Sequence, residues 1–176
     1  MAAKSIFVSH ISQEGEYAGL LKCMIEEDFL GLVQCFTSSD LTSIAAGENW
    51  LAAVESGLRK ATGMLVLCSK ASLQRQWVHV EVGAAWMTGI PIVPVCHSGM
   101  KKDDLEIPLS LRQGVELPSE RGVAKLYAGI ARILEVPRPP LPGRLDERLR
   151  RMGEIEARLA RAEAQDAAAA GNRLVV

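Results

Sequence analysis

The sequence predicts a doubly wound α/β fold, in which helices cover both faces of one parallel sheet. Short apolar runs alternate five times with segments whose apolar residues recur at helical spacing. The runs are apolar at nearly every position, which a strand needs when both of its faces are covered. Right-handed crossovers between such strands then place the connecting helices on the two faces of the sheet.

The first half of the chain contains two strand and helix pairs. Residues 5–9 form an apolar run, and helical periodicity begins after Ser12, which suits an N-cap, and ends at Gly31. Residues 32–36 are expected to form a second buried strand. A polar loop then leads past Gly47 to a helix with apolar positions between residues 50 and 61.

Three more strands and two more helices complete the pattern. A third strand at residues 64–68 precedes a helix expected from about Ser72 to Thr88. Residues 89–96 are expected to form a fourth strand, and its two prolines each remove a ladder donor, which predicts a place near a sheet edge or a bulge. A short fifth strand at 114–117 and a helix starting near Ser119 complete a domain of residues 4–135.

The end of the chain differs from this domain. A proline-rich linker at residues 136–143 precedes a tail at 144–176, which we expect to be helical and partly disordered. The helix has one apolar stripe, formed by Leu145, Leu149, Met152, Ile155 and Leu159. Such a stripe packs either on its own domain or on another chain. We favour another chain, because pairing there would raise the local concentration of the domain.

Composition excludes several classes of partner and location. Lys and Arg number 20 against 21 Asp and Glu, so no overall basic field exists for nucleic acid or a membrane surface. No apolar run is long enough to span a bilayer, and Lys4 leads straight into the first strand without a signal peptide, which predicts a cytoplasmic protein. The four cysteines lack zinc-ligand spacing and are expected to be buried, reduced thiols.

Polar residues gather at the predicted carboxyl ends of the strands, where ligands bind in open α/β sheets. They are Ser9-His10, Ser38-Ser39-Asp40, Cys68-Ser69 and Cys96-His97. A Ser-His-Asp hydrolase is not supported, because no G-x-S-x-G turn occurs and adjacent strand residues point to opposite faces. No glycine-rich phosphate loop is present either. Neither His10 nor His97 is expected to bind a metal.

Glu81 is the most unusual residue of the helix expected after the third strand. Helical spacing places Trp77 one turn before it, beside a stripe of apolar residues that looks like core: Val78, Val82, Ala85 and Trp86. In one interpretation Glu81 lies at the rim of the core and reaches solvent or an arginine. In the other, an aromatic ring and a partly desolvated carboxylate hold a planar base and stabilise positive charge on a sugar.

Several segments in a fixed order favour the second interpretation. They are Ile6-Phe7-Val8-Ser9-His10, Ser39-Asp40 with Ile44 to Trp50, Leu67-Cys68-Ser69 with Ser72 and Trp77-x-x-x-Glu81, and Gly89-Ile90-Pro91-Ile92-Val93-Pro94-Val95. Together they resemble the Toll/interleukin-1 receptor (TIR) domain, particularly its bacterial members, over residues 4–135. The chain departs from that family in having Ala45-Ala46 where a proline is common and Ser39-Asp40 in place of Arg-Asp.

The resemblance implies a flavodoxin-like sheet of five parallel strands and cleavage of the nicotinamide–ribose bond of NAD⁺. It assigns the catalytic role to Glu81 and an aromatic contact to Trp77, and we expect further substrate contacts from Ser9, His10, Ser38 and Asp40. NAD⁺ is then a substrate, and no cofactor or metal is expected. The resemblance also implies activation by self-association with other TIR domains, a sensor protein as a further partner, and a role in bacterial antiphage defence or signalling.

Two other functions stay open at this stage. One is a TIR adaptor without enzymatic activity, which acts through TIR–TIR contacts of the loop from Asp40 to Trp50. The other is an enzyme of the nucleoside deoxyribosyltransferase type, which also uses a carboxylate beside a sugar.

Overall fold

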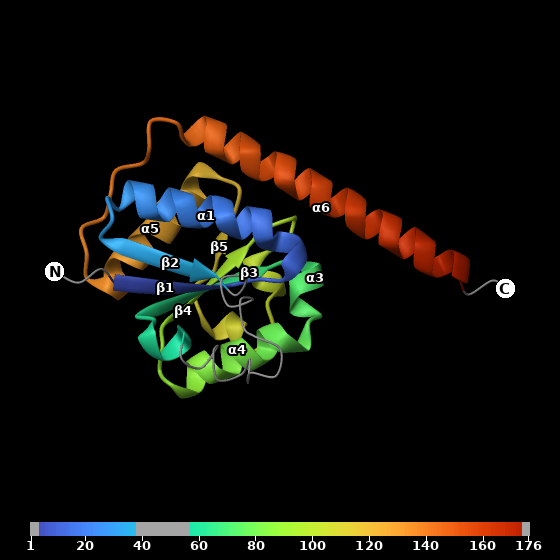
Figure 1. The fold of residues 1–176 in the computed structure, drawn as a ribbon, viewed down its shortest axis with the longest axis horizontal. Coiled ribbons are helices and arrows are strands. Elements are labelled where there is room, and N and C mark those ends of the chain that lie inside the picture. Colours follow the sequence, from blue (N-terminus) through green and yellow to red (C-terminus); the bar gives the residue numbers. More distant parts are fainter. Residues whose placement is uncertain (1–3, 38–56, 174–176) are drawn as a thin grey trace, which may run out of the picture.

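The computed structural model describes residues 4–37 and 57–173, with side chains as far as residue 165. A five-stranded sheet forms its centre, with all strands parallel and in the order β2-β1-β3-β4-β5 (Figure 1). The strands are β1 (Lys4–Ser9), β2 (Val33–Thr37), β3 (Gly63–Cys68), β4 (Ile92–Cys96) and β5 (Val115–Glu116). This arrangement confirms the predicted doubly wound, flavodoxin-like fold.

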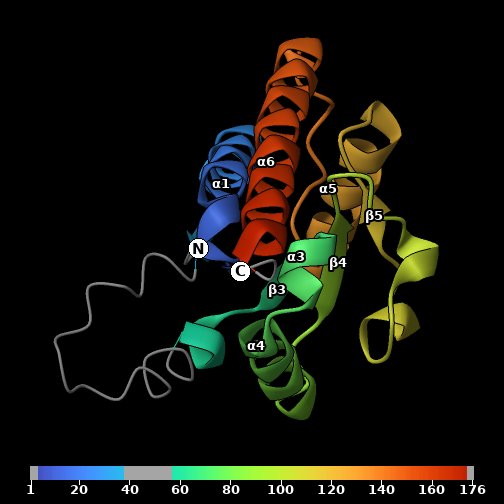
Figure 2. The same cartoon turned by 90° about the vertical axis from the view of Figure 1, so that its right-hand side faces the viewer.

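Helices form a layer on each face of the sheet (Figures 1 and 2). One face carries α1 (Gly15–Asp28), α5 (Glu120–Leu134) and α6 (Leu145–Arg173), and the other carries α3 (Lys70–Leu73) and α4 (Gln76–Met87). Short 3₁₀ turns lie at Ser12–Glu14, Lys102–Asp104 and Leu109–Leu111. The chain leaves β1 toward one layer and the adjacent β3 toward the other, so the two carboxyl ends flank the switch in strand order.

Side chains alternate between the two layers along each strand. In β1, Ile6 and Val8 belong to the core under α1, α5 and α6, whereas Phe7 belongs to the core beside α4. The same parity sends Ser9, at the end of β1, toward α4 and His10 toward α1. The alternation therefore separates neighbouring polar residues onto opposite faces of the sheet.

Turn and cap residues set the ends of the helices. Past the end of α1, Gly31 has a φ of +75°, a conformation that glycine adopts without a steric penalty. Ser119 caps α5 by accepting a hydrogen bond from the Gly122 backbone N–H at 2.9 Å. A Cβ at Gly122 would lie 2.0 Å from the carbonyl oxygen of Glu116, so only glycine lets α5 begin this close to β5.

The single helix expected from Ser72 to Thr88 is wrong, because two helices occupy this segment. Ser69 caps α3 by accepting a hydrogen bond from the Ser72 backbone N–H at 3.1 Å, which starts the helix earlier. Arg75 then has an extended backbone and separates α3 from α4.

The position of β4 agrees with the prediction of a place near a sheet edge. β4 lies second from the edge, between β3 and β5, but β5 pairs only with Val95 and Cys96. Pro94 precedes this short pairing. The part of the strand that carries Pro94 therefore has no strand partner on the β5 side among the described residues, which is how an inner strand tolerates a missing N–H.

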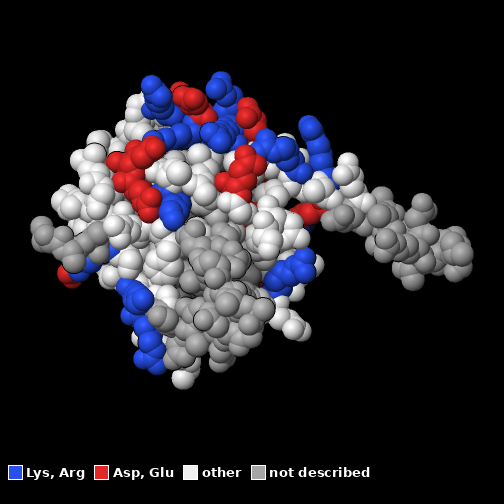
Figure 3. All heavy atoms as spheres, in the orientation of Figure 1, with Lys and Arg blue, Asp and Glu red and all other residues white. Residues whose placement is uncertain are grey.

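The expectation that the apolar stripe of the tail pairs with another chain is wrong. In α6, Leu145, Met152 and Ile155 are buried in the core that α1 and α5 also form. Arg148 makes ion pairs with Glu27 at 2.7 Å and with Asp28 at 2.5 Å. Figure 3 shows the resulting mixture of acidic and basic side chains over this part of the surface. The stripe is thus covered by its own chain.

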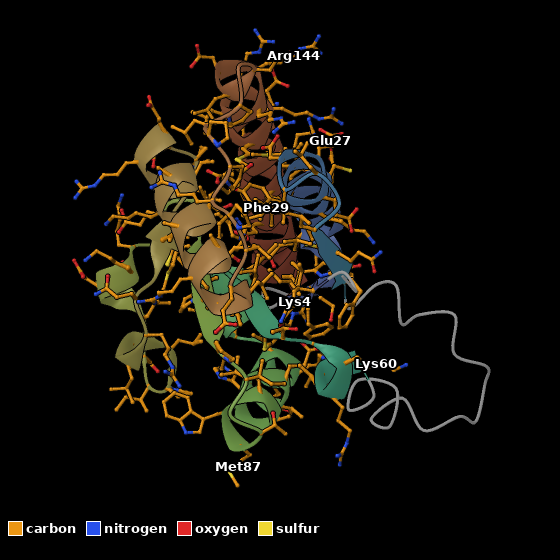
Figure 4. All side chains as sticks on the ribbon, turned by 90° about the vertical axis from the view of Figure 1, so that its left-hand side faces the viewer. Lys4, Glu27, Phe29, Lys60, Met87 and Arg144 are labelled. Atoms are coloured by element: carbon orange, nitrogen blue, oxygen red, sulfur yellow. The ribbon has the colours of Figure 1, made fainter. Side chains whose placement is uncertain are left out.

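Phe29 illustrates how the helices of this layer interlock. Its side chain, labelled in Figure 4, lies inward between α1 and α5, and its ring meets the ring of Tyr127 edge-on at 5.5 Å between centroids. The Tyr127 hydroxyl donates to Asp28, which also binds Arg148 of α6. Aromatic packing and a shared carboxylate therefore join α1, α5 and α6.

Two side chains lie nearer the surface than the sequence predicted. All four cysteines are free, and Cys35, Cys68 and Cys96 are buried as expected, but Cys23 is exposed. Trp86, expected in the core stripe of α4, is 37% exposed and carries the Arg112 guanidinium 4.6 Å above its ring. Within residues 4–37 and 57–173, no helix has both the length and the apolar character to cross a bilayer.

Candidate active site

Glu81 lies on the face of α4 that is turned to the sheet, and its side chain is 0% exposed. The indole Nε1–H of Trp77, one helical turn earlier, donates to Oε1 of Glu81 at 2.7 Å. The hydroxyl of Ser9, which strand alternation directs toward α4, donates to Oε2. Both carboxylate oxygens are therefore held by donors from two different elements.

The electrostatics of Glu81 reflect two opposing effects. Burial raises the pKa of its carboxyl group, because a charge is poorly solvated in the core, and the hydrogen bonds from Ser9 and Trp77 lower it. These bonds stabilise the ionised form and fix its orientation. Both sequence interpretations of Glu81 need correction here: it does not lie at a solvated rim, and its desolvation is complete rather than partial.

The position of this group matches the place where doubly wound sheets bind ligands. Ser9 ends β1, and α4 follows β3 on the other side of the switch in strand order. Glu81 itself has no surface open to solvent. A ligand can therefore touch its carboxylate only after neighbouring groups have moved.

A second buried carboxylate, Glu14, lies on the opposite face of the sheet. Its Oε1 accepts from the Ser69 hydroxyl at 2.6 Å and lies 3.1 Å from Nε2 of His97, and its Oε2 accepts from the Ile11 backbone N–H at 3.3 Å. The His97 ring stacks on Tyr17, with centroids 4.6 Å apart. Glu14 is 2% exposed, and Ser69 and His97 are 3% and 0% exposed.

Sequence reasoning noted Ser69 and His97 at strand ends but missed Glu14. The available signal was the parity of the strands. Leu67 of β3 and Val95 of β4 face α1, so Ser69 and His97, two residues further along, face the same layer. Glu14 begins that layer as the last residue of the 3₁₀ turn before α1.

The structure brings together only part of the residue set predicted for the site. Ser9, Trp77 and Glu81 form one hydrogen-bonded group. His10 is 6% exposed, with Nδ1 3.2 Å from the carbonyl oxygen of Val8, and its ring lies near the start of α1. Strand alternation thus places His10 away from Glu81. Ser38 and Asp40, like the loop from Asp40 to Trp50, lie outside the described residues.

In a comparison with known protein families, residues 6–128 match the family described as TIR domain. The chain belongs to the TIR domain family. No curated protein matches it. The matched part of this TIR domain includes Ser9, Trp77 and Glu81 together with Glu14, Ser69 and His97, and it ends before α6 begins. The residues that carried the sequence resemblance therefore fall inside the matched range.

Proposed function

We propose that this TIR domain cleaves NAD⁺ at the bond between nicotinamide and ribose, and that Glu81 is its catalytic residue. One observation carries the proposal: a buried carboxylate with both oxygens held by hydrogen bonds, at the switch in strand order. A carboxylate fixed in advance in a medium of low dielectric constant is suited to stabilise positive charge that develops in a transition state.

The reaction needs little more than this carboxylate. When the glycosidic C–N bond breaks, its electron pair returns to the pyridinium nitrogen, so nicotinamide leaves as a neutral molecule and needs no general acid. The ribose that remains has oxocarbenium character, which Glu81 stabilises by its charge and by hydrogen bonds to the ribose hydroxyls. Water then adds and loses a proton, which gives ADP-ribose, whereas attack by the adenine base gives a cyclic product.

Trp77 has two tasks in this proposal. Its N–H orients Glu81, and its half-buried ring offers an apolar face against which a planar base can stack. Ser9 orients the other carboxylate oxygen. Nicotinamide therefore binds beside Trp77, with the ribose C1′ next to Glu81.

Self-association is the proposed source of activation. Because Glu81 is 0% exposed, the isolated chain has a closed site, and a rearrangement has to uncover the carboxylate before NAD⁺ can bind. Contacts between TIR domains, set up by a sensor protein, would favour the open arrangement. The protein would then be an effector of bacterial antiphage defence or signalling.

The same closed site favours a second candidate function, that of a TIR adaptor without catalysis. A carboxylate whose two oxygens are fully engaged inside the core is also a good structural element. In this case Glu81 joins α4 to β1, and the protein acts only through contacts with other TIR domains.

Incubation of the purified protein with NAD⁺, with and without a crowding agent, separates the two functions. Nicotinamide release is measured by chromatography, and assembly is followed by light scattering in the same samples. The enzyme releases nicotinamide when assembled, and the matched Glu81→Gln protein, equally assembled, does not. Assembly of the unaltered protein without nicotinamide release would support the adaptor instead.

A further inference from the structure

The buried carboxylate of Glu14 contacts three segments that end at the same edge of the sheet. The backbone N–H of Ile11 belongs to the turn after β1, the hydroxyl of Ser69 belongs to the turn after β3, and the ring of His97 follows β4. Each of these turns leads into a different part of the chain. Glu14 therefore connects the segments that follow β1, β3 and β4, just past the ends of these strands.

Two of the three contacts lead directly to the group around Glu81. Ile11 lies two residues after Ser9, which holds Oε2 of Glu81. Ser69 caps α3, and α3 packs on α4, which carries Trp77 and Glu81 itself. Glu14 thus contacts the turn that follows the donor, Ser9, and the cap of the helix that precedes α4, which carries the acceptor, Glu81.

The third contact extends this arrangement to α6. Tyr17 stacks on His97 and donates its hydroxyl to Oε1 of Glu156 in α6 at 3.1 Å. Burial and the negative charge of Glu156 raise the pKa of Tyr17, so its hydroxyl remains a neutral donor. The position of α6 is therefore connected, through Tyr17 and His97, to Glu14.

We propose that Glu14 is a positioning residue for Glu81, and that Tyr17 and Glu156 make its placement depend on the docking of α6. The inference rests on the proposed NAD⁺ cleavage for its consequence, but the geometry that it claims is measurable without activity. Glu14 does not touch the substrate. It determines whether Ser9 and Trp77 meet the carboxylate of Glu81 in the arrangement that the reaction needs.

Glu14→Gln is the sharpest variant for this proposal. An amide has a single acceptor oxygen, so in one orientation it loses the bond from the Ile11 N–H, and in the other its NH₂ group replaces the oxygen that accepts from Ser69. The direct readout is the indole N–H resonance of Trp77 in a proton–nitrogen correlation spectrum, which reports the bond to Glu81 and is assigned with a Trp77→Phe protein. The resonance should shift in the variant.

The kinetic readout follows from the loss of alignment. Misplacement of a catalytic group lowers turnover, so kcat should fall roughly ten- to a hundredfold while KM changes less than about twofold. The variant replaces no residue that contacts the substrate in the proposed reaction, which is why KM should change less than kcat. A folded Glu14→Gln protein with an unshifted Trp77 resonance and an unchanged kcat overturns the proposal.

Tyr17→Phe tests the connection to α6 and does not depend on how well Glu14→Gln folds. It keeps the ring stacked on His97 and removes only the bond to Glu156. Its matched control is Arg158→Ala, which breaks a different, exposed ion pair between α6 and α1, that of Arg158 with Glu16 at 2.6 Å. We expect Tyr17→Phe to shift the Trp77 resonance and the control to leave it in place.

The outcomes separate this inference from the proposed function. A Trp77 shift in Glu14→Gln and Tyr17→Phe, without a shift in Arg158→Ala, supports the positioning role even when the unaltered protein releases no nicotinamide. Release of nicotinamide by the unaltered protein, with neither kcat nor the Trp77 resonance responding to the two variants, overturns the inference and leaves the proposed function standing. Equal shifts in all three variants overturn the specific connection through Tyr17.

Discussion

Replacement of Glu81 by glutamine should have opposite effects on activity and on stability. Glutamine has the same shape, and both of its polar atoms find partners: its oxygen accepts from Trp77, and its nitrogen donates to the hydroxyl oxygen of Ser9. Only the charge is lost. By analogy with the removal of one oxyanion-hole donor, the activation free energy should rise by about 2.7–4 kcal/mol, so that kcat falls roughly a hundred- to a thousandfold.

The effect on stability follows from the raised pKa of Glu81 in the folded protein. Between the ordinary glutamate pKa and this raised value, the folded state binds more protons than the unfolded state, so the free energy of unfolding falls as pH rises. Above that window the ionised carboxylate continues to cost stability. Glutamine does not titrate, so the melting temperature of Glu81→Gln minus that of the unaltered protein should increase with pH.

Thermal unfolding of both proteins between about pH 4 and pH 8 measures this difference, since that range covers the ordinary glutamate pKa and values above it. The matched control is Glu81→Ala, which leaves the Ser9 hydroxyl without its acceptor and opens a cavity. An orphaned buried donor costs about 1–3 kcal/mol, which lowers the melting temperature of a chain of this size by several degrees. A glutamine variant that is less stable than the unaltered protein at pH 8 would refute the reasoning about burial.

Three further predictions follow from the same contacts. Trp77→Phe keeps an aromatic ring but removes a donor that lowers the pKa of Glu81, so the acid limb of the pH–rate profile of nicotinamide release should move to higher pH; an unmoved limb means that the bond does not act on the reactive carboxylate. Met152→Ala should lower the free energy of unfolding in urea by about 2–5 kcal/mol, because Met152 is 0% exposed between α6 and the core, and a loss under about 1 kcal/mol would contradict the docking of α6. The rate of NAD⁺ cleavage should rise more steeply than linearly with protein concentration, and a linear dependence across the transition from monomer to oligomer would exclude activation by assembly.

Local patterns were sufficient to predict the architecture. The apolar runs at residues 5–9 and 64–68 became inner strands because a covered strand is apolar on both faces, and this property is visible in a single sequence. The division between α3 and α4 was not predictable in this way. It depends on the capping bond of Ser69 and the extended backbone of Arg75.

The tail shows a second limit of sequence patterns. The apolar stripe that includes Met152 has the same spacing whether it packs on α1 or on another chain, so the sequence could not decide between these partners. The decision comes from contacts far along the chain, such as the ion pair of Arg148 with Asp28. Such pairs have no local signature.

In the candidate site, too, contacts between residues close in sequence were predictable, whereas contacts between distant residues were not. Trp77 and Glu81 are four residues apart on one helix, so their contact follows from helical geometry and was predictable. The bond from Ser9 joins residues 72 positions apart, and that between Glu14 and His97 spans 83 positions. These contacts exist only after the strand register has brought the ends of β1, β3 and β4 to one edge of the sheet.

Chromatography of the products formed from a mixture of NAD⁺ and free nucleosides tests the central claim most directly. At a protein concentration where light scattering shows assembly, the account predicts free nicotinamide and an equal amount of linear and cyclic ADP-ribose together, with the nucleosides intact. The Glu81→Gln protein under the same conditions should release nicotinamide at least about a hundredfold more slowly. Assembled protein that leaves NAD⁺ intact, or that releases bases from the nucleosides instead, would contradict the account.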